Sequence, residues 1–182
     1  MTWELFVRLF HVDVPEELIA GLLFVAVIGV VTVVRFVESN RRNWIVGGLA
    51  AAYILVMLWI TVISRLDRVS EEFRYCLQPL WCIDAIKSGL IEVLYEKVFN
   101  VIFFVPLGII SALATCKWWK VLLFGFITSV AIELLQLVTR TGMCETDDIL
   151  CNTAGFVIGY GFVKLCSFFT YKIYNYAKTR NT

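Results

Sequence analysis

The sequence predicts an all-α integral membrane protein, a helical bundle with about five transmembrane helices and short interfacial helices. Of its 182 residues, 60% are hydrophobic and 17% are charged, against about 45–50% and about 25% in soluble domains. The mean hydropathy is +0.81. Apolar runs long enough to cross a hydrocarbon core of about 30 Å occur at Leu18–Val37, Trp44–Ile63, Val98–Ala114, Val121–Val138 and Ile149–Phe169.

Two amphipathic segments complete the predicted architecture. Met1–Glu17 carries aromatic residues on one helical face, and Asp84–Lys97 alternates apolar and charged residues at helical spacing. We expect both to lie at the membrane interface, the second leading directly into the third span. The N-terminus lacks a basic stretch followed closely by a cleavable apolar run, so we expect the first span to act as its own insertion signal. Without repeats or linkers, residues 1–182 are predicted to form a single domain.

Charge and composition exclude several classes of function. The net charge of +1 gives no indication of a nucleic-acid partner. His11 is the sole histidine, which excludes a histidine-based zinc or iron site. The six cysteines form no CxxC pair, so we expect them to behave as small apolar residues. If exposed outside the cell, three of them could form disulfides: Cys76, Cys82 and Cys144.

Basic residues near the span ends favour an N-terminus outside and a C-terminus inside. The connections then assigned to the inside are short and densely basic, whereas the outside ones are longer and carry most of the acids. The inside set comprises Arg35, Arg41, Arg42, Lys117, Lys120, Lys164, Lys172, Lys178 and Arg180.

The fourth predicted span carries polar side chains close to its end. A carboxylate at membrane depth costs roughly 2.5–3.5 kcal/mol on insertion scales and is a functional-site candidate by default. Glu133, Gln136 and Arg140 are spaced i, i+3 and i+7, so we expect them to share one helix face.

The third and fifth spans bring polar groups to the same membrane side. The fifth span begins at Asp147 or Asp148, and Asn152 lies one turn beyond Asp148 on the same face. The third span begins close to Asn100. We therefore predict one shared pocket, on the outer surface if the orientation above holds.

One role for this pocket is the binding of an anionic amphiphile. Arg140, together with Arg65 at the end of the second span, could hold a phosphate or carboxylate bidentately. The amide side chains of Asn100, Gln136 and Asn152 would supply further hydrogen bonds.

A second role uses the carboxylates for chemistry. Glu133, Asp147 and Asp148 are candidate ligands for Mg²⁺ or Ca²⁺, because both ions prefer oxygen ligands. Alternatively, one of the three could act as a general acid or base in a membrane enzyme. No nucleophile with an adjacent base stands out, so binding is the favoured role.

A purely structural role stays open for each residue. Glu133 and Arg140 could form a buried ion pair, and Asp147 or Asp148 could cap the fifth span. The amides could hydrogen-bond between helices, for about 0.6 kcal/mol each. The GxxxG pattern of Gly155–Gly159 is typical of a packing surface.

Several short blocks carry a resemblance to a known family. They are Gln78-Pro79-Leu80, the run Asn100–Gly108, Glu133-Leu-Leu-Gln136 followed by Arg140, and the run Asp147–Gly155. Together, in order and spacing, these blocks resemble the motifs of the VanZ-like, or teicoplanin-resistance, family.

The resemblance covers roughly Tyr53 to Phe162 and implies a cell-envelope protein of the bacterial cytoplasmic membrane. The founding member of the family raises tolerance to teicoplanin-type lipoglycopeptides without altering the peptidoglycan terminus that these drugs bind. The resemblance thus implies membrane lipids, a lipid-linked envelope precursor or a lipoglycopeptide as partners. It implies a process and not a reaction, so binding protein, enzyme and scaffold all remain open.

Overall fold

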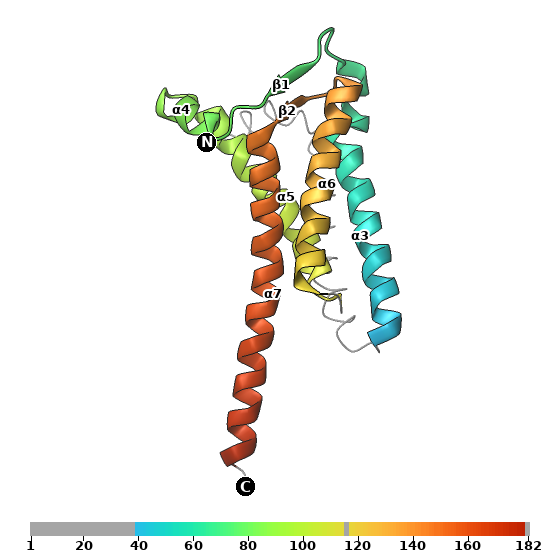
Figure 1. Ribbon diagram of the computed structural model, residues 1–182, viewed down its shortest axis with the longest axis vertical. Coiled ribbons are helices and arrows are strands. Elements are labelled where there is room, and N and C mark those ends of the chain that lie inside the picture. The colour runs from blue at the N-terminus through green and yellow to red at the C-terminus, as the bar shows by residue number, and fades with distance from the viewer. Residues whose placement is uncertain (1–38, 115–116, 181–182) are drawn as a thin grey trace.

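The structure, a computed structural model, describes residues 39–114 and 117–180. The predicted first span and the N-terminal amphipathic segment lie outside these residues. Within them the predicted all-α membrane bundle is confirmed, since four helices are long and apolar enough to cross a membrane. Figure 1 shows these helices side by side, with the C-terminal end of α7 extending well beyond the others. They are α3 (Ser39–Thr61), α5 (Ile91–Ser111), α6 (Trp118–Thr139) and α7 (Thr146–Arg180).

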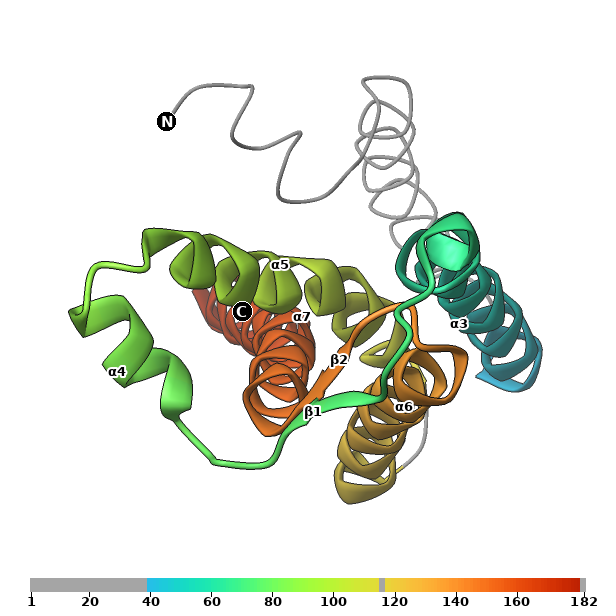
Figure 2. The same ribbon diagram turned by 90° about the horizontal axis from the view of Figure 1, so that it is seen from above.

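A small parallel sheet, which the sequence did not predict, lies across one end of the bundle (Figures 1 and 2). Strand β1 (Arg74–Cys76) pairs with β2 (Met143–Glu145), and Cys76 is the register partner of Glu145. Three-residue strands are too short to show the alternating pattern from which strands are predicted. The short 3-10 helix η1 (Ile63–Arg68) connects α3 to this end of the bundle.

The predicted interfacial helix over Asp84–Lys97 is wrong in its extent. The short helix α4 (Trp81–Lys87) includes the first four residues of the predicted helix and then ends, and α5 begins at Ile91. Gly89 lies in the break with φ of 97°, a conformation that glycine adopts without steric cost. The last seven residues of the predicted helix therefore form the first two turns of α5. Helix α4 lies to the side of the bundle, beyond α5 and α7 in the view of Figure 2.

Glycines allow α5 and α7 to pack closely. A methyl group at Gly155 would overlap the backbone carbonyl of Val101, and one at Gly159 would overlap that of Val105. Phe156, between these glycines, is fully buried in the hydrophobic core. The packing role considered for the GxxxG motif is thus the one that the structure shows.

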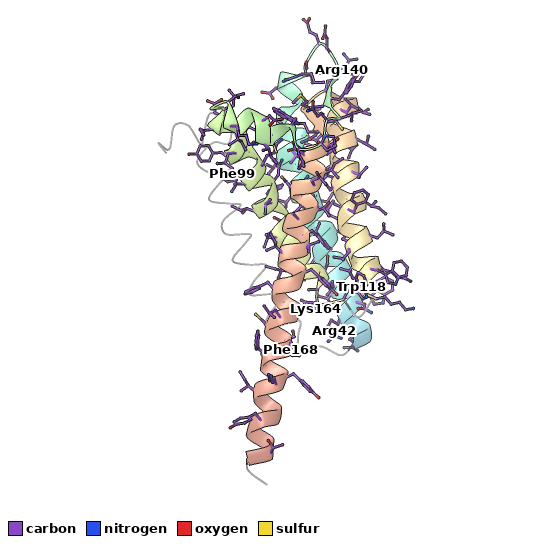
Figure 3. The ribbon with its side chains drawn as sticks, turned by 60° about the vertical axis from the view of Figure 1, so that its left-hand side comes forward. Arg42, Phe99, Trp118, Arg140, Lys164 and Phe168 are labelled. Atoms are coloured by element: carbon purple, nitrogen blue, oxygen red, sulfur yellow. The ribbon has the colours of Figure 1, made fainter. Side chains whose placement is uncertain are left out.

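One hydrogen bond ties α3 to this pair, and another joins α7 to the end of α5. The Tyr53 hydroxyl on α3 donates to the Phe103 carbonyl on α5 at 2.9 Å. At the end of the bundle away from the sheet, Lys164 Nζ donates to the Ala112 carbonyl at 2.8 Å. Figure 3 shows Lys164 near that end and Arg140 at the opposite end, beside the sheet. The sheet end is where the predicted polar residues gather.

Candidate functional site

A pocket of about 370 Å³ lies at the sheet end of the bundle. It is formed by the end of α3, the start of α5, the end of α6 and the start of α7, with η1 and the loop before β2 beside them. Apolar side chains from Phe103, Phe104 and Ile132 also line it. Six of the eight predicted site residues line it: Arg65, Asn100, Glu133, Gln136, Asp148 and Asn152.

Helix α6 supplies two of these side chains from adjacent turns. Glu133 is buried, and its carboxylate accepts a hydrogen bond from the backbone N–H of Glu145 at 3.2 Å. The Gln136 amide donates to the carbonyl of Thr61, at the end of α3, at 3.3 Å. These bonds fix the end of α6 against both β2 and α3.

A buried lysine next to the pocket holds several acids together. Lys97 Nζ lies 2.5 Å from a carboxylate oxygen of Glu145, 2.5 Å from one of Asp148 and 3.7 Å from one of Glu96. The side chain of Lys97 is 6% exposed. The Trp81 indole N–H donates to the same Glu145 carboxylate at 3.1 Å. The cluster links α4, α5, β2 and the start of α7.

The acids outnumber the cations around the pocket. Lys97 pairs with Glu145 behind the wall and with Asp148 on the lining, and Arg65 is the cationic side chain on the lining. The four carboxylates are Glu96, Glu133, Glu145 and Asp148. Formally, the described part of this site therefore carries two more negative than positive charges.

The predicted metal ligands do not assemble into one group. Instead, the carboxylate oxygens of Glu96, Glu145 and Asp148 lie within 4.8 Å of one another. Such oxygens would suit Mg²⁺ or Ca²⁺. However, the Lys97 ammonium bonds to two of these three carboxylates at 2.5 Å and so holds the position of a cation. With Lys97 charged, this group does not fit a divalent metal.

A family model described as VanZ/LLP1 matches residues 50–167. The chain belongs to the VanZ/LLP1 family. The match confirms the resemblance drawn from the sequence blocks, and it includes every residue that lines the pocket. No curated protein and no solved structure matches the chain.

Arg140 does not line the pocket of this VanZ/LLP1 protein. Helix α6 ends at Thr139, and Arg140 is its C-cap in the left-handed conformation, with φ of 57°. The helix therefore ends before Arg140, and the prediction that Arg140 shares a helix face with Glu133 is wrong. The Arg140 guanidinium donates to the Glu71 carbonyl at 3.2 Å and lies 4.6 Å from the Phe73 ring centroid.

Asp147 also points away from the VanZ/LLP1 pocket. Its carboxylate, on a residue only 1% exposed, accepts hydrogen bonds from the backbone N–H groups of Leu80 and Cys82. The capping role considered for this residue thus applies, but to the start of α4 and not to its own helix. Leu80 has a positive φ of 63°, a conformation that these two bonds help to hold.

Sequence reasoning missed three charged residues of the site, namely Glu96, Lys97 and Glu145. Helical spacing could have found two of them, because Glu96 and Lys97 precede Asn100 by four and three residues on α5, and residues at these spacings are neighbours on a helix surface. Both had been assigned to the interfacial helix. Glu145 carries no such signal, since it lies on a three-residue strand.

Two cysteines of this VanZ/LLP1 protein lie close to the site acids, outside the spans. Burial raises the pKa of the Cys82 thiol to about 11, and its hydrogen bond to Asp147 adds to the effect. Burial also raises the pKa of Cys144, beside Glu133. Both thiols therefore stay protonated at neutral pH and are poor nucleophiles. The structure leaves Cys76, Cys82 and Cys144 as free thiols.

Proposed function

We propose that this VanZ/LLP1 protein binds the polar headgroup of an anionic envelope amphiphile in the pocket. The amphiphile would be a phospholipid, a lipid-linked wall precursor or a lipoglycopeptide. The observation that carries the proposal is the mixed lining of the pocket, which combines a guanidinium, amides and carboxylates with apolar side chains. The pocket lies at one end of four helices that are apolar enough to cross a membrane. Ligand pockets commonly combine an apolar lining with a few convergent polar groups.

Arg65 takes the anionic group in this proposal. It lines the pocket on η1, whereas Arg140 does not. Guanidinium groups bind phosphate and carboxylate through two parallel hydrogen bonds. The amides of Asn100, Gln136 and Asn152 would orient the rest of the headgroup.

The apolar part of the ligand would lie along the outside of the helices. Phe103, Phe104 and Ile132 form the apolar wall of the pocket, and side chains such as Ile102 and Leu135 are exposed on the adjacent helix surfaces. Acyl chains in the bilayer can cover those surfaces while the headgroup enters the polar end. In the proposed orientation the pocket faces outside, where it would contribute to tolerance of teicoplanin-type drugs.

Arg65→Lys is expected to weaken binding of phosphatidylglycerol about tenfold, because a lysine cannot form the two parallel bonds of a guanidinium. Titration of the purified protein with short-chain phosphatidylglycerol, followed by native mass spectrometry, gives the affinity. Arg140→Lys is the matched control, since Arg140 lies outside the pocket, and it should bind like the wild type. Equal affinities for all three proteins would contradict the role of Arg65.

A membrane enzyme is the second candidate function, favoured by the buried Glu133 carboxylate on the pocket lining. General acid–base catalysis contributes about 10²–10⁴-fold, so an enzyme would lose turnover by this factor in Glu133→Gln at any lipid concentration.

We expect instead that Glu133→Gln changes affinity alone. A loss of drug tolerance caused by this variant in a susceptible bacterium should then disappear when the variant is expressed more strongly, because more protein compensates for weaker binding. Lipid extracts from cells with wild-type and variant protein should show the same species by mass spectrometry. A lipid product present with the wild type and absent with a normally expressed Glu133→Gln variant would favour the enzyme.

A further inference from the structure

Carboxylates outnumber cationic side chains at the pocket even when Lys97, which neutralises one of them from behind the wall, is counted. In the part of the chain that the structure describes, Glu96, Glu133 and Asp148 line the pocket together with the cationic side chain of Arg65. Lys97 does not line it, and its Nζ is bonded to Glu145 and Asp148. Carboxylate charge held away from water is costly, and it is relieved either by a proton or by a cationic partner. A ligand with a positive group would supply that partner.

An unpartnered amide points to a ligand independently of the charges. Asn152 is 4% exposed and lines the pocket. Among the residues that the structure describes, no hydrogen bond to its side chain is found, and its amide is open to the pocket instead of being sealed in the core. Buried side-chain amides are nearly always hydrogen-bonded, so a ligand in the pocket is the natural partner for this one. Its carbonyl oxygen can accept a hydrogen bond from a cationic donor.

An ammonium group suits these acceptors better than a metal ion does. A divalent ion would need the grouped carboxylates of Glu96, Glu145 and Asp148, where the Lys97 ammonium already lies. A primary ammonium needs three acceptors in hydrogen-bond reach and no coordination shell. Three groups on the lining can provide them: the carboxylate of Glu133, the second carboxylate oxygen of Asp148 and the amide oxygen of Asn152.

We propose that the headgroup bound here carries a protonated primary amine close to its phosphate, as phosphoethanolamine does. Glu133, Asp148 and Asn152 receive the ammonium group, and Arg65 receives the phosphate. This inference rests on the proposed binding function and narrows its ligand class from anionic headgroups in general to amine-bearing ones.

The test compares three short-chain lipids that share their acyl chains: phosphatidylethanolamine, its N-acetylated form and phosphatidylglycerol. Each is titrated into the full-length wild-type protein in detergent, and the affinity is read by native mass spectrometry. N-acetylation removes the charge and keeps the phosphate. We expect it to weaken binding about tenfold, the effect of losing one charge-assisted hydrogen bond. Equal affinity for the amine and its acetylated form would overturn the inference.

Two variants locate the amine within the pocket. Glu133→Gln and Asn152→Ala should each reduce the preference for phosphatidylethanolamine over its N-acetylated form to about threefold or less. Asn152→Ala removes one of the three acceptors, Glu133→Gln removes the negative charge of another, and neither residue is bonded to Lys97. Glu92→Gln is the matched control, because Glu92 is exposed on α5 and does not line the pocket. An undiminished preference in both folded pocket variants would overturn the proposed position of the amine.

Two further measurements distinguish a lipid headgroup from a soluble ligand, and an ammonium group from a metal ion. Free phosphoethanolamine that displaces the lipid completely would support the amine but assign it to a soluble ligand. If Mg²⁺ at millimolar concentration raised phosphatidylglycerol binding to the level of the amine lipid, a metal and not an ammonium would be the missing cation. Saturable phosphatidylglycerol binding without any amine preference would sink this inference alone. If no amphiphile bound saturably, the proposed function itself would fail.

Discussion

Lys97→Met is expected to lower the free energy of unfolding by about 3–5 kcal/mol, the usual effect of removing one partner of a buried ion pair. Glu145 and Asp148 are 2% and 6% exposed, and both would lose the ammonium that lies 2.5 Å away. Methionine keeps the length of the lysine stem, so the change removes charge more than volume. The measurement is reversible unfolding of the purified protein in mixed detergent micelles.

The control for this variant is Lys87→Met, at the exposed end of α4, which should change stability by less than about 0.5 kcal/mol. Adding Glu145→Gln and Asp148→Asn to Lys97→Met removes the stranded charges and should restore most of the loss. If the single variant were as stable as the control, Lys97 would not be holding the acids together. If the triple variant were no better than the single one, lost packing and not lost charge would be the cause.

Gly155→Ala is the second change with a large expected effect, about 3 kcal/mol at the upper end of the range for overpacked cores. Its methyl group would overlap the backbone carbonyl of Val101. A backbone atom cannot move aside as a flexible side chain can, so α5 and α7 would have to separate. Asn100 and Asn152 lie on these helices within a turn of the contact, and lipid binding should weaken together with stability.

Gly161→Ala provides the matched control on the same helix, because nothing lies within 4 Å of a methyl group at that position. It should be neutral or slightly stabilising, since alanine is the better helix former. Both variants can be compared by the same unfolding measurement and by the lipid titration. Equal stability of the two alanine variants would show that α5 and α7 do not approach as closely as the structure has them.

Most of the pocket could be predicted from the sequence because its residues lie on long, strongly apolar helices. The spacing of Glu133 and Gln136, and that of Asp148 and Asn152, places each pair on one helix face whatever the helices pack against. The turn of each span in which they lie follows from where the apolar runs end. The same reasoning extended one residue too far at Arg140, because helix ends are set by local caps that periodicity does not reveal.

Helical spacing could not predict which residues the charged side chains contact. Lys97 meets Glu145 and Asp148 across 48 and 51 residues of sequence, and Asp147 meets the start of α4 across 65 and 67. Asp147 and Asp148 are adjacent and look alike in the sequence, yet Asp148 lines the pocket and Asp147 caps α4. The role of each depends on how the start of α7 packs against β2 and α4.

Hydrophobic runs and helical periods were thus enough to predict a membrane bundle with polar groups at one end, since both are properties of contiguous segments. The family followed from short motif blocks, and the family model confirmed it. Tertiary structure decided which acids face the pocket, that Lys97 pairs with Glu145 and Asp148, and that Arg65 and not Arg140 lies on the lining. These outcomes depend on the close approach of α5 and α7 and on the β1–β2 pairing. Contacts between distant segments of this kind leave no periodic trace in the chain.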